Sequence, residues 1–113
     1  MSDLQITTEQ VNGILVLRLA GDPQIIAAPE MMENLFNDTV ASKPSRVVID
    51  LTRLEYIGSL VAGRLVAMQN FLRRNGGSAV IAGPNKLVKD ALTRMRVVTT
   101  IPVHDTLEQA LAS

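Results

Sequence analysis

The sequence predicts an α/β domain in which an antiparallel hairpin opens an otherwise parallel sheet. The first observation is Asn12-Gly13 between two β-type segments, because both residues tolerate positive φ and favour a tight hairpin turn. The second is the β-branched run Val47-Val48-Ile49, which is typical of a central parallel strand covered on both faces. The third is the regular exchange of strand segments with apolar residues at helical spacing. Together they predict the order β-β-α-β-α-β-α-β-α with right-handed crossovers.

The hairpin strands are expected at residues 4–8 and 14–19. A helix is expected to begin near Pro29, because proline suits the first helical turn, and to end at Pro44, which cannot continue it. Alternate residues of the second strand form a strongly apolar face, namely Leu15, Leu17 and Leu19. The buried stripe of the helix is predicted to consist of Met32, Leu35, Phe36, Thr39 and Val40.

A second helix is expected after the central strand, starting at Ser59 and ending at Asn75-Gly76-Gly77, an αL-type stop. Its buried side is predicted to carry Val61, Ala62, Leu65, Met68 and Leu72. Its exposed side is predicted to carry Arg64, Gln69, Asn70 and Arg73.

The last third of the chain predicts two further strands, at residues 78–82 and 101–104, each followed by a helix. Asn85 is predicted to cap the first of these helices, and Asp105 the second, because residues 105–108 have the spacing of a capping box. Pro102 indicates that the last strand lies at an edge. The expected apolar faces are Leu87, Val88, Ala91, Leu92 and Met95, and then Leu107, Ala110 and Leu111.

Composition narrows the function classes. The 113 residues fit one domain, taken as residues 1–113, and the absence of cysteine excludes disulfides, thiolate metal sites and a cysteine nucleophile. Lys+Arg and Asp+Glu are balanced at 11 each, so the basic surface of a nucleic-acid-binding protein is missing. No apolar run approaches the roughly 20 residues that span a bilayer, and the N-terminus lacks a signal-type segment. We therefore expect a cytoplasmic protein that binds no nucleic acid and does not insert into a membrane.

Signals for catalysis are weak. His104 is the only histidine, and a hydrolase built on Ser59 and His104 would also need an orienting carboxylate and an oxyanion hole. The glycines do not form a phosphate-binding loop, because neither GxxxxGK[ST] nor GxGxxG is present. We expect no enzymatic activity and no cofactor.

Ser59 is the most informative residue, because it stands where a buried strand region gives way to an amphipathic helix. Its hydroxyl group can cap the helix by accepting a hydrogen bond from a main-chain N–H group. It can also be phosphorylated, since the start of a helix favours negative charge. The plain N-cap is the commoner of the two interpretations.

In several short segments the chain resembles a STAS domain, the fold of the anti-sigma factor antagonists. The resemblance covers nearly the whole length and depends on the order of segments that are individually weak. These are Leu19-Ala20-Gly21 followed by Ala28-Pro29-Glu30, then Val47-Val48-Ile49-Asp50-Leu51, Tyr56-Ile57-Gly58-Ser59, Gly76-Gly77, Ala82-Gly83-Pro84 and Asp105-Thr106-Leu107-Glu108-Gln109-Ala110-Leu111.

The resemblance implies a regulatory switch. Ser59 falls on the position that a partner kinase of the histidine-kinase-like ATPase class phosphorylates on serine in this family. The unphosphorylated form would bind its partner, an anti-sigma factor, and a PP2C-type phosphatase would reset the switch. The ATP belongs to the kinase. The implied partner-binding residues are Gln24, Ile25, Ile57, Gly58, Leu60 and Val61.

A second interpretation stays open. Where the family usually has acidic residues, this chain has Gln24 and Gly58. These two departures favour a STAS module that does not switch, acting as a scaffold in a signalling assembly or as an accessory subunit of a lipid-transport system.

Overall fold

A five-stranded mixed sheet forms the centre of the computed structural model, which describes residues 4–22 and 28–113. The strands lie in the order β1-β2-β3-β4-β5. They span β1 (Gln5–Val11), β2 (Ile14–Gly21), β3 (Arg46–Leu54), β4 (Ser78–Ala82) and β5 (Val103–His104). β1 pairs with β2 antiparallel, whereas the other neighbouring strands pair in parallel. The predicted mixed sheet and its opening hairpin are therefore confirmed.

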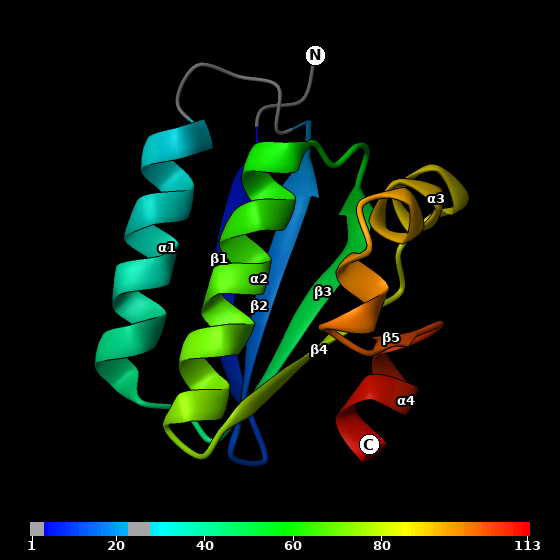
Figure 1. The fold of residues 1–113 in the computed structure, drawn as a ribbon. Helices are drawn as coiled ribbons and strands as arrows, with labels where there is room; N and C mark the ends of the chain where they lie inside the picture. The colour runs from blue at the N-terminus through cyan, green and yellow to red at the C-terminus, as the bar shows by residue number, and fades with distance from the viewer. Residues whose placement is uncertain (1–3, 23–27) are drawn as a thin grey trace.

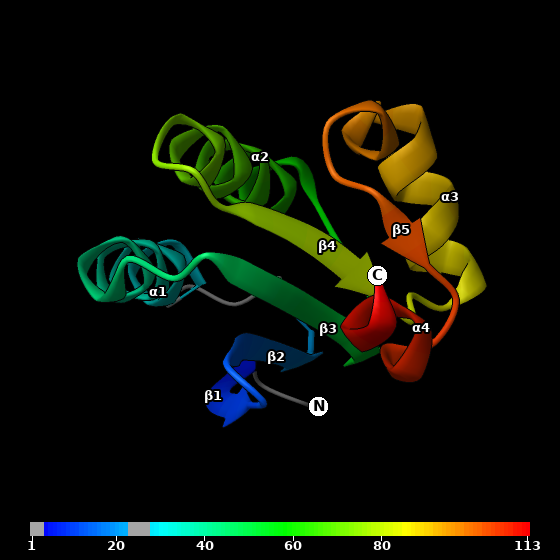
Figure 2. The same ribbon diagram turned by 90° about the horizontal axis from the view of Figure 1, so that it is seen from below.

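Helices cover the two faces of the sheet unequally (Figures 1 and 2). The helices α1 (Ala28–Ser42), α2 (Ser59–Arg74) and α3 (Lys86–Arg94) contribute to one large apolar cluster. A short 3-10 helix, η1 (Val97–Thr99), follows α3. The last helix, α4 (Leu107–Ala112), packs on the opposite face of the sheet.

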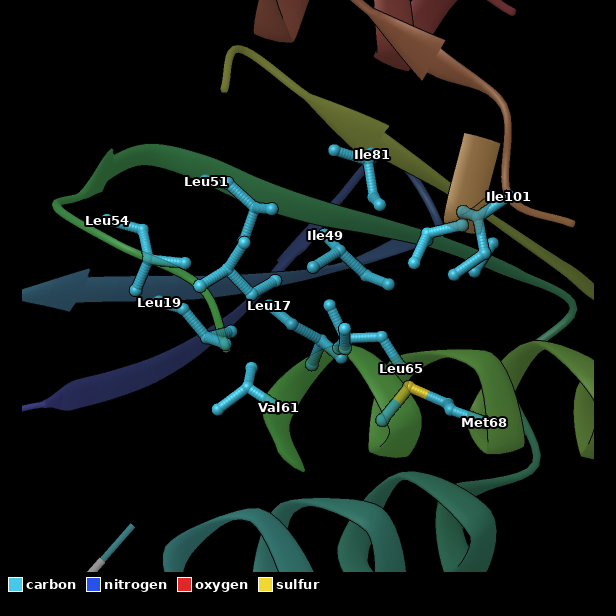
Figure 3. Close-up of a cluster of buried hydrophobic side chains, with 14 of the residues drawn as sticks. Leu17, Leu19, Ile49, Leu51, Leu54, Val61, Leu65, Met68, Ile81 and Ile101 are labelled. Carbon is cyan, nitrogen blue, oxygen red and sulfur yellow. The ribbon is translucent and has the colours of Figure 1, made fainter. Parts of the chain in front are cut away.

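The main core is aliphatic, as a sequence with 3% aromatic residues requires. It lies between the sheet and α2, where branched side chains from three strands meet the helix (Figure 3). Its fully buried members include Leu17, Leu19, Ile49, Leu51, Leu65, Met68 and Ile81. A smaller cluster under α4 joins Ile14, Val16, Val48, Ala82 and Ala110. β3 thus has buried side chains on both faces, which is what the β-branched run predicted.

Two of the predicted turns are observed. Asn12 and Gly13 have φ values of 51° and 82°, so both central residues of the hairpin turn are left-handed. This brings Val11 opposite Ile14 and sets the register of β1 against β2. Gly76, after α2, also has a positive φ, of 81°.

The prediction for Gln69 is wrong. Its side chain is completely buried rather than exposed. The amide nitrogen donates hydrogen bonds to the carbonyl groups of Ala79 (2.9 Å) and Thr100 (3.1 Å), and the amide oxygen accepts one from the N–H group of Ala79 (2.7 Å). Gln69 lies four residues after Leu65 on α2, so helical spacing places it on the buried face, where these three bonds satisfy its polar atoms.

Three details of the C-terminal third also differ from expectation. Leu87 is 53% exposed, although it was expected on the apolar face of α3. β5 is shorter than predicted. Thr106, not Asp105, is the N-cap of α4, because its hydroxyl group accepts a hydrogen bond from the N–H group of Gln109 (3.1 Å). The Gln109 side chain in turn accepts from the N–H group of Asp105 (3.2 Å), so the reciprocal cap is shifted by one residue.

Candidate functional site

The candidate site lies at the edge of the sheet where β3 and β4 end. These strands are parallel neighbours, α2 follows β3, and α3 follows β4. Both helices therefore begin at the same edge, which is where open α/β sheets usually place their functional loops. Residues 55–58 connect β3 to α2 and carry the sequence immediately before Ser59.

Asn85 ties the start of α3 to the end of β3. Its side-chain nitrogen donates a hydrogen bond to the carbonyl group of Leu54 (3.1 Å), while its side-chain oxygen accepts one from the N–H group of Val88 (2.8 Å). The predicted cap of α3 is therefore confirmed, and the same amide holds the position from which the 55–58 connection departs.

Ser59 is exposed and is the first residue of α2. The N-cap is Gly58, with φ −106° and ψ 178°, and no side chain caps the helix. The prediction of Ser59 as N-cap is thus wrong by one residue, because the extended backbone conformation that defines a cap belongs to Gly58. Within the described part of the chain, the Ser59 hydroxyl group forms no hydrogen bond, so it is free to react.

The surroundings of Ser59 combine an exposed apolar residue with buried supports. Leu60 is 47% exposed and stands next to the hydroxyl group. Ile57 and Val61, by contrast, are 1% and 2% exposed and belong to the main core. Their side chains anchor the 55–58 connection and the first turn of α2. The burial of Val61 confirms its predicted place on the buried side of the helix, whereas Ile57 is not on the surface as predicted. Figure 3 shows Val61 facing the leucines of the sheet.

Gly58 is half-buried, and its backbone conformation is one that any residue adopts. A Cβ atom built there would meet the ring of Tyr56 at 3.6 Å, an ordinary contact. The glycine is therefore not required for steric reasons. Gln24 and Ile25, the remaining predicted contact residues, lie outside the described residues.

A cavity of about 300 Å³ opens beside Ser59. One side is formed by residues 56–59, and the other by Ala91, Arg94 and Met95 at the end of α3. Arg94 is not among the site residues that the sequence predicts. No local pattern marks it, because the end of α3 and the residues around Ser59 come to line one cavity only in the folded chain.

His104 does not line this cavity, so the structure does not bring it together with Ser59 in one pocket. Across residues 4–22 and 28–113, no group of three or more His, Cys, Asp or Glu side chains is arranged to hold a metal ion. In the same ranges, no helix has the length and hydropathy needed to cross a membrane.

A larger cavity, of about 480 Å³, lies elsewhere, against β1, β2 and β3. Asp50 in its wall is 5% exposed, but its carboxylate is fully engaged. It pairs with Arg18 (3.3 Å) and accepts hydrogen bonds from the N–H group (3.0 Å) and the hydroxyl group (2.7 Å) of Thr52. Because these polar groups satisfy one another, we take the smaller cavity at Ser59 as the candidate site.

Proteins of known function or structure resemble this chain in sequence and in fold. The chain is 27% identical over 108 residues to the anti-sigma-F factor antagonist RsfB of Mycobacterium tuberculosis, covering 96% of this chain and 87% of that protein. The crystal structure of an anti-sigma factor antagonist from Mycobacterium paratuberculosis superposes with a TM-score of 0.86 at 24% identity, covering 97% of this chain and 92% of that one.

The anti-sigma factor antagonist SpoIIAA has the same fold in two states. Its unphosphorylated form gives a TM-score of 0.78 at 16% identity, covering 95% of this chain and 93% of that one. The phosphorylated form of SpoIIAA, a Bacillus cell fate determinant, gives 0.71 at 16%, covering 96% and 97%. The family model described as the STAS domain matches residues 5–110. The chain therefore belongs to the STAS domain family.

Proposed function

We propose that the protein is a regulator of the anti-sigma factor antagonist type, which binds its partner through the surface around Ser59 and is released when Ser59 is phosphorylated. The observation that carries this proposal is the exposed Ser59 hydroxyl group at the start of α2, beside the exposed Leu60; it forms no hydrogen bond with the residues that the structure describes. The relatives named as anti-sigma factor antagonists support the class of partner.

The phosphorylation step needs only the hydroxyl group of this chain. The Ser59 oxygen attacks the γ-phosphorus of the ATP that the kinase holds, ADP leaves, and the hydroxyl proton passes to the kinase. The partner is an anti-sigma factor that is itself a serine kinase of the histidine-kinase-like ATPase class, and a PP2C-type phosphatase reverses the step. Phosphorylation and dephosphorylation take place in the cytoplasm, and the chain acts as a regulator, not as an enzyme.

The switch follows from the balance of two energies. A phosphate adds about −1.5 to −2 charges at neutral pH, and the start of a helix stabilises such a charge by about 0.3–1 kcal/mol. Burying the same charge beneath a partner costs several kcal/mol unless it is paired. Since about 1.4 kcal/mol corresponds to tenfold in affinity, desolvation dominates and the phosphorylated form releases the partner.

The test compares three forms of the full chain. A kinase of this class from the same organism is titrated with wild type, Ser59→Ala and Ser59→Asp by calorimetry. We expect Ser59→Ala to bind like wild type and Ser59→Asp to bind at least tenfold more weakly. Equal affinities for the two variants contradict the proposal. Incubation with the kinase and ATP should give a phosphopeptide containing Ser59 by mass spectrometry.

A second candidate is a STAS scaffold that does not switch. The observation that favours it is the N-terminus of α2, where Gly58 occupies the cap and no acidic residue is present in the first turn. If the chain is a scaffold, Ser59→Ala and Ser59→Asp should bind the partner with the same affinity, and incubation with the kinase should give no phosphopeptide. The same two measurements therefore separate the alternatives.

A further inference from the structure

Arg94 is placed in the cavity beside Ser59 from a different element. It is an exposed residue in the last turn of α3, and with Ala91 and Met95 it forms the wall opposite residues 56–59. The cavity, at about 300 Å³, is much larger than the roughly 30 Å³ that one water molecule occupies. The cation and the hydroxyl group thus line the same cavity.

The guanidinium group of Arg94 is unpaired within residues 4–22 and 28–113. Four other cations of these residues form ion pairs with carboxylate side chains, whereas the rest, like Arg94, form none. Arg18 pairs with Glu9 and Asp50, Arg64 with Glu33, Lys86 with Asp90, and Lys89 with Asp105. The carboxylate one turn before Arg94, Asp90, is therefore held by Lys86 at 3.2 Å.

Among the residues that the structure describes, no carboxylate lines the cavity. Tyr56 is the only other titratable side chain that these residues contribute to its wall, and a neutral phenol does not neutralise a guanidinium group. The cavity therefore holds one unpaired positive charge and one hydroxyl group that can acquire negative charge.

We propose that Arg94 binds the phosphate of phosphorylated Ser59 within the same chain. This deepens the proposed function, on whose phosphoacceptor it rests. The planar guanidinium group offers paired N–H donors that match two phosphate oxygens, which makes arginine the preferred partner for this group. The phosphoserine then bridges the start of α2 to the end of α3 and closes the cavity, so phosphorylation changes the shape of the site as well as its charge.

The experiment installs phosphoserine at position 59 during synthesis, by genetic encoding, so it needs neither kinase nor partner. The second pKa of the phosphate is measured by ³¹P NMR titration in the wild-type background and in Arg94→Gln, Arg94→Lys and Arg73→Gln. Arg73→Gln is the matched control, because it removes the same charge at the far end of α2.

We expect Arg94→Gln to raise this pKa by about 0.3–0.7 units, since the nearby cation favours the dianion. Arg94→Lys should fall between wild type and Arg94→Gln, and Arg73→Gln should match wild type. Equal pKa values in wild type and Arg94→Gln, or equal shifts in Arg94→Gln and Arg73→Gln, overturn the proposal. A kinase that leaves Ser59 unmodified contradicts the proposed function without changing this result.

Discussion

Asn85 and Leu54 are joined by a hydrogen bond of 3.1 Å that spans 31 residues of sequence. The same asparagine caps α3 through the N–H group of Val88. One side chain thus connects the end of β3, where the segment leading to Ser59 begins, with the helix that carries Arg94. The two halves of the candidate site are held together by this amide.

Asn85→Ala should destabilise the protein by about 1–3 kcal/mol, because it removes a cap and leaves the carbonyl group of Leu54 without its donor. Urea unfolding monitored by circular dichroism measures this loss. Asn85→Asp keeps the cap oxygen and removes only the donor, so its cost should be smaller. Equal losses in the two variants would show that the cap contributes nothing.

Gly58→Asp should stabilise the protein by a few tenths of a kcal/mol. The extended conformation of Gly58 suits any residue, a Cβ atom meets only Tyr56 at 3.6 Å, and an aspartate oxygen can accept from the first free N–H groups of α2. Gly58→Ala is the control, and it should be neutral or slightly destabilising, because alanine is a poorer cap than glycine. A loss above about 1 kcal/mol in both variants, read from thermal unfolding, would mean that the site has no room for a side chain.

Leu60→Gln should weaken binding of the partner kinase at least tenfold and leave folding almost unchanged. Leu60 is 47% exposed, so a polar side chain there costs no more than about 0.5 kcal/mol of stability, whereas an apolar contact with the partner is lost. Leu87→Gln is the matched control, because Leu87 is 53% exposed on α3. Calorimetric titration distinguishes the two, and wild-type affinity in Leu60→Gln would exclude this residue from the interface.

Replacing two glycines by alanine should change the free energy of unfolding in opposite directions. At Gly83, with φ +65°, a Cβ atom would clash with Cγ2 of Thr52, so Gly83→Ala should cost more than about 2 kcal/mol. Gly63 lies within α2, and a Cβ atom there has no neighbour within 4 Å, so Gly63→Ala should add about 0.5–1 kcal/mol. Urea midpoints of both variants measure the contrast, which fails if the two shift in the same direction.

Local sequence patterns predicted the elements well because their causes are local. The Asn12-Gly13 turn depends on the φ preferences of two residues, and the central position of β3 follows from the burial of consecutive β-branched residues. Polarity alone was a poorer guide. Gln69 was predicted to be exposed because it is polar, although its spacing from Leu65 places it on the buried face of α2.

The sequence by itself determined the order of strands and helices, the mixed sheet, and the position of Ser59 at the start of α2, because each depends on periodicity and turn chemistry within a few residues. Only the tertiary structure decided that Ile57 is an anchor and that Arg94 shares a cavity with Ser59. The physical reason is that burial and shared cavities depend on how segments distant in the sequence are placed on the sheet, and no spacing within a single segment encodes that placement.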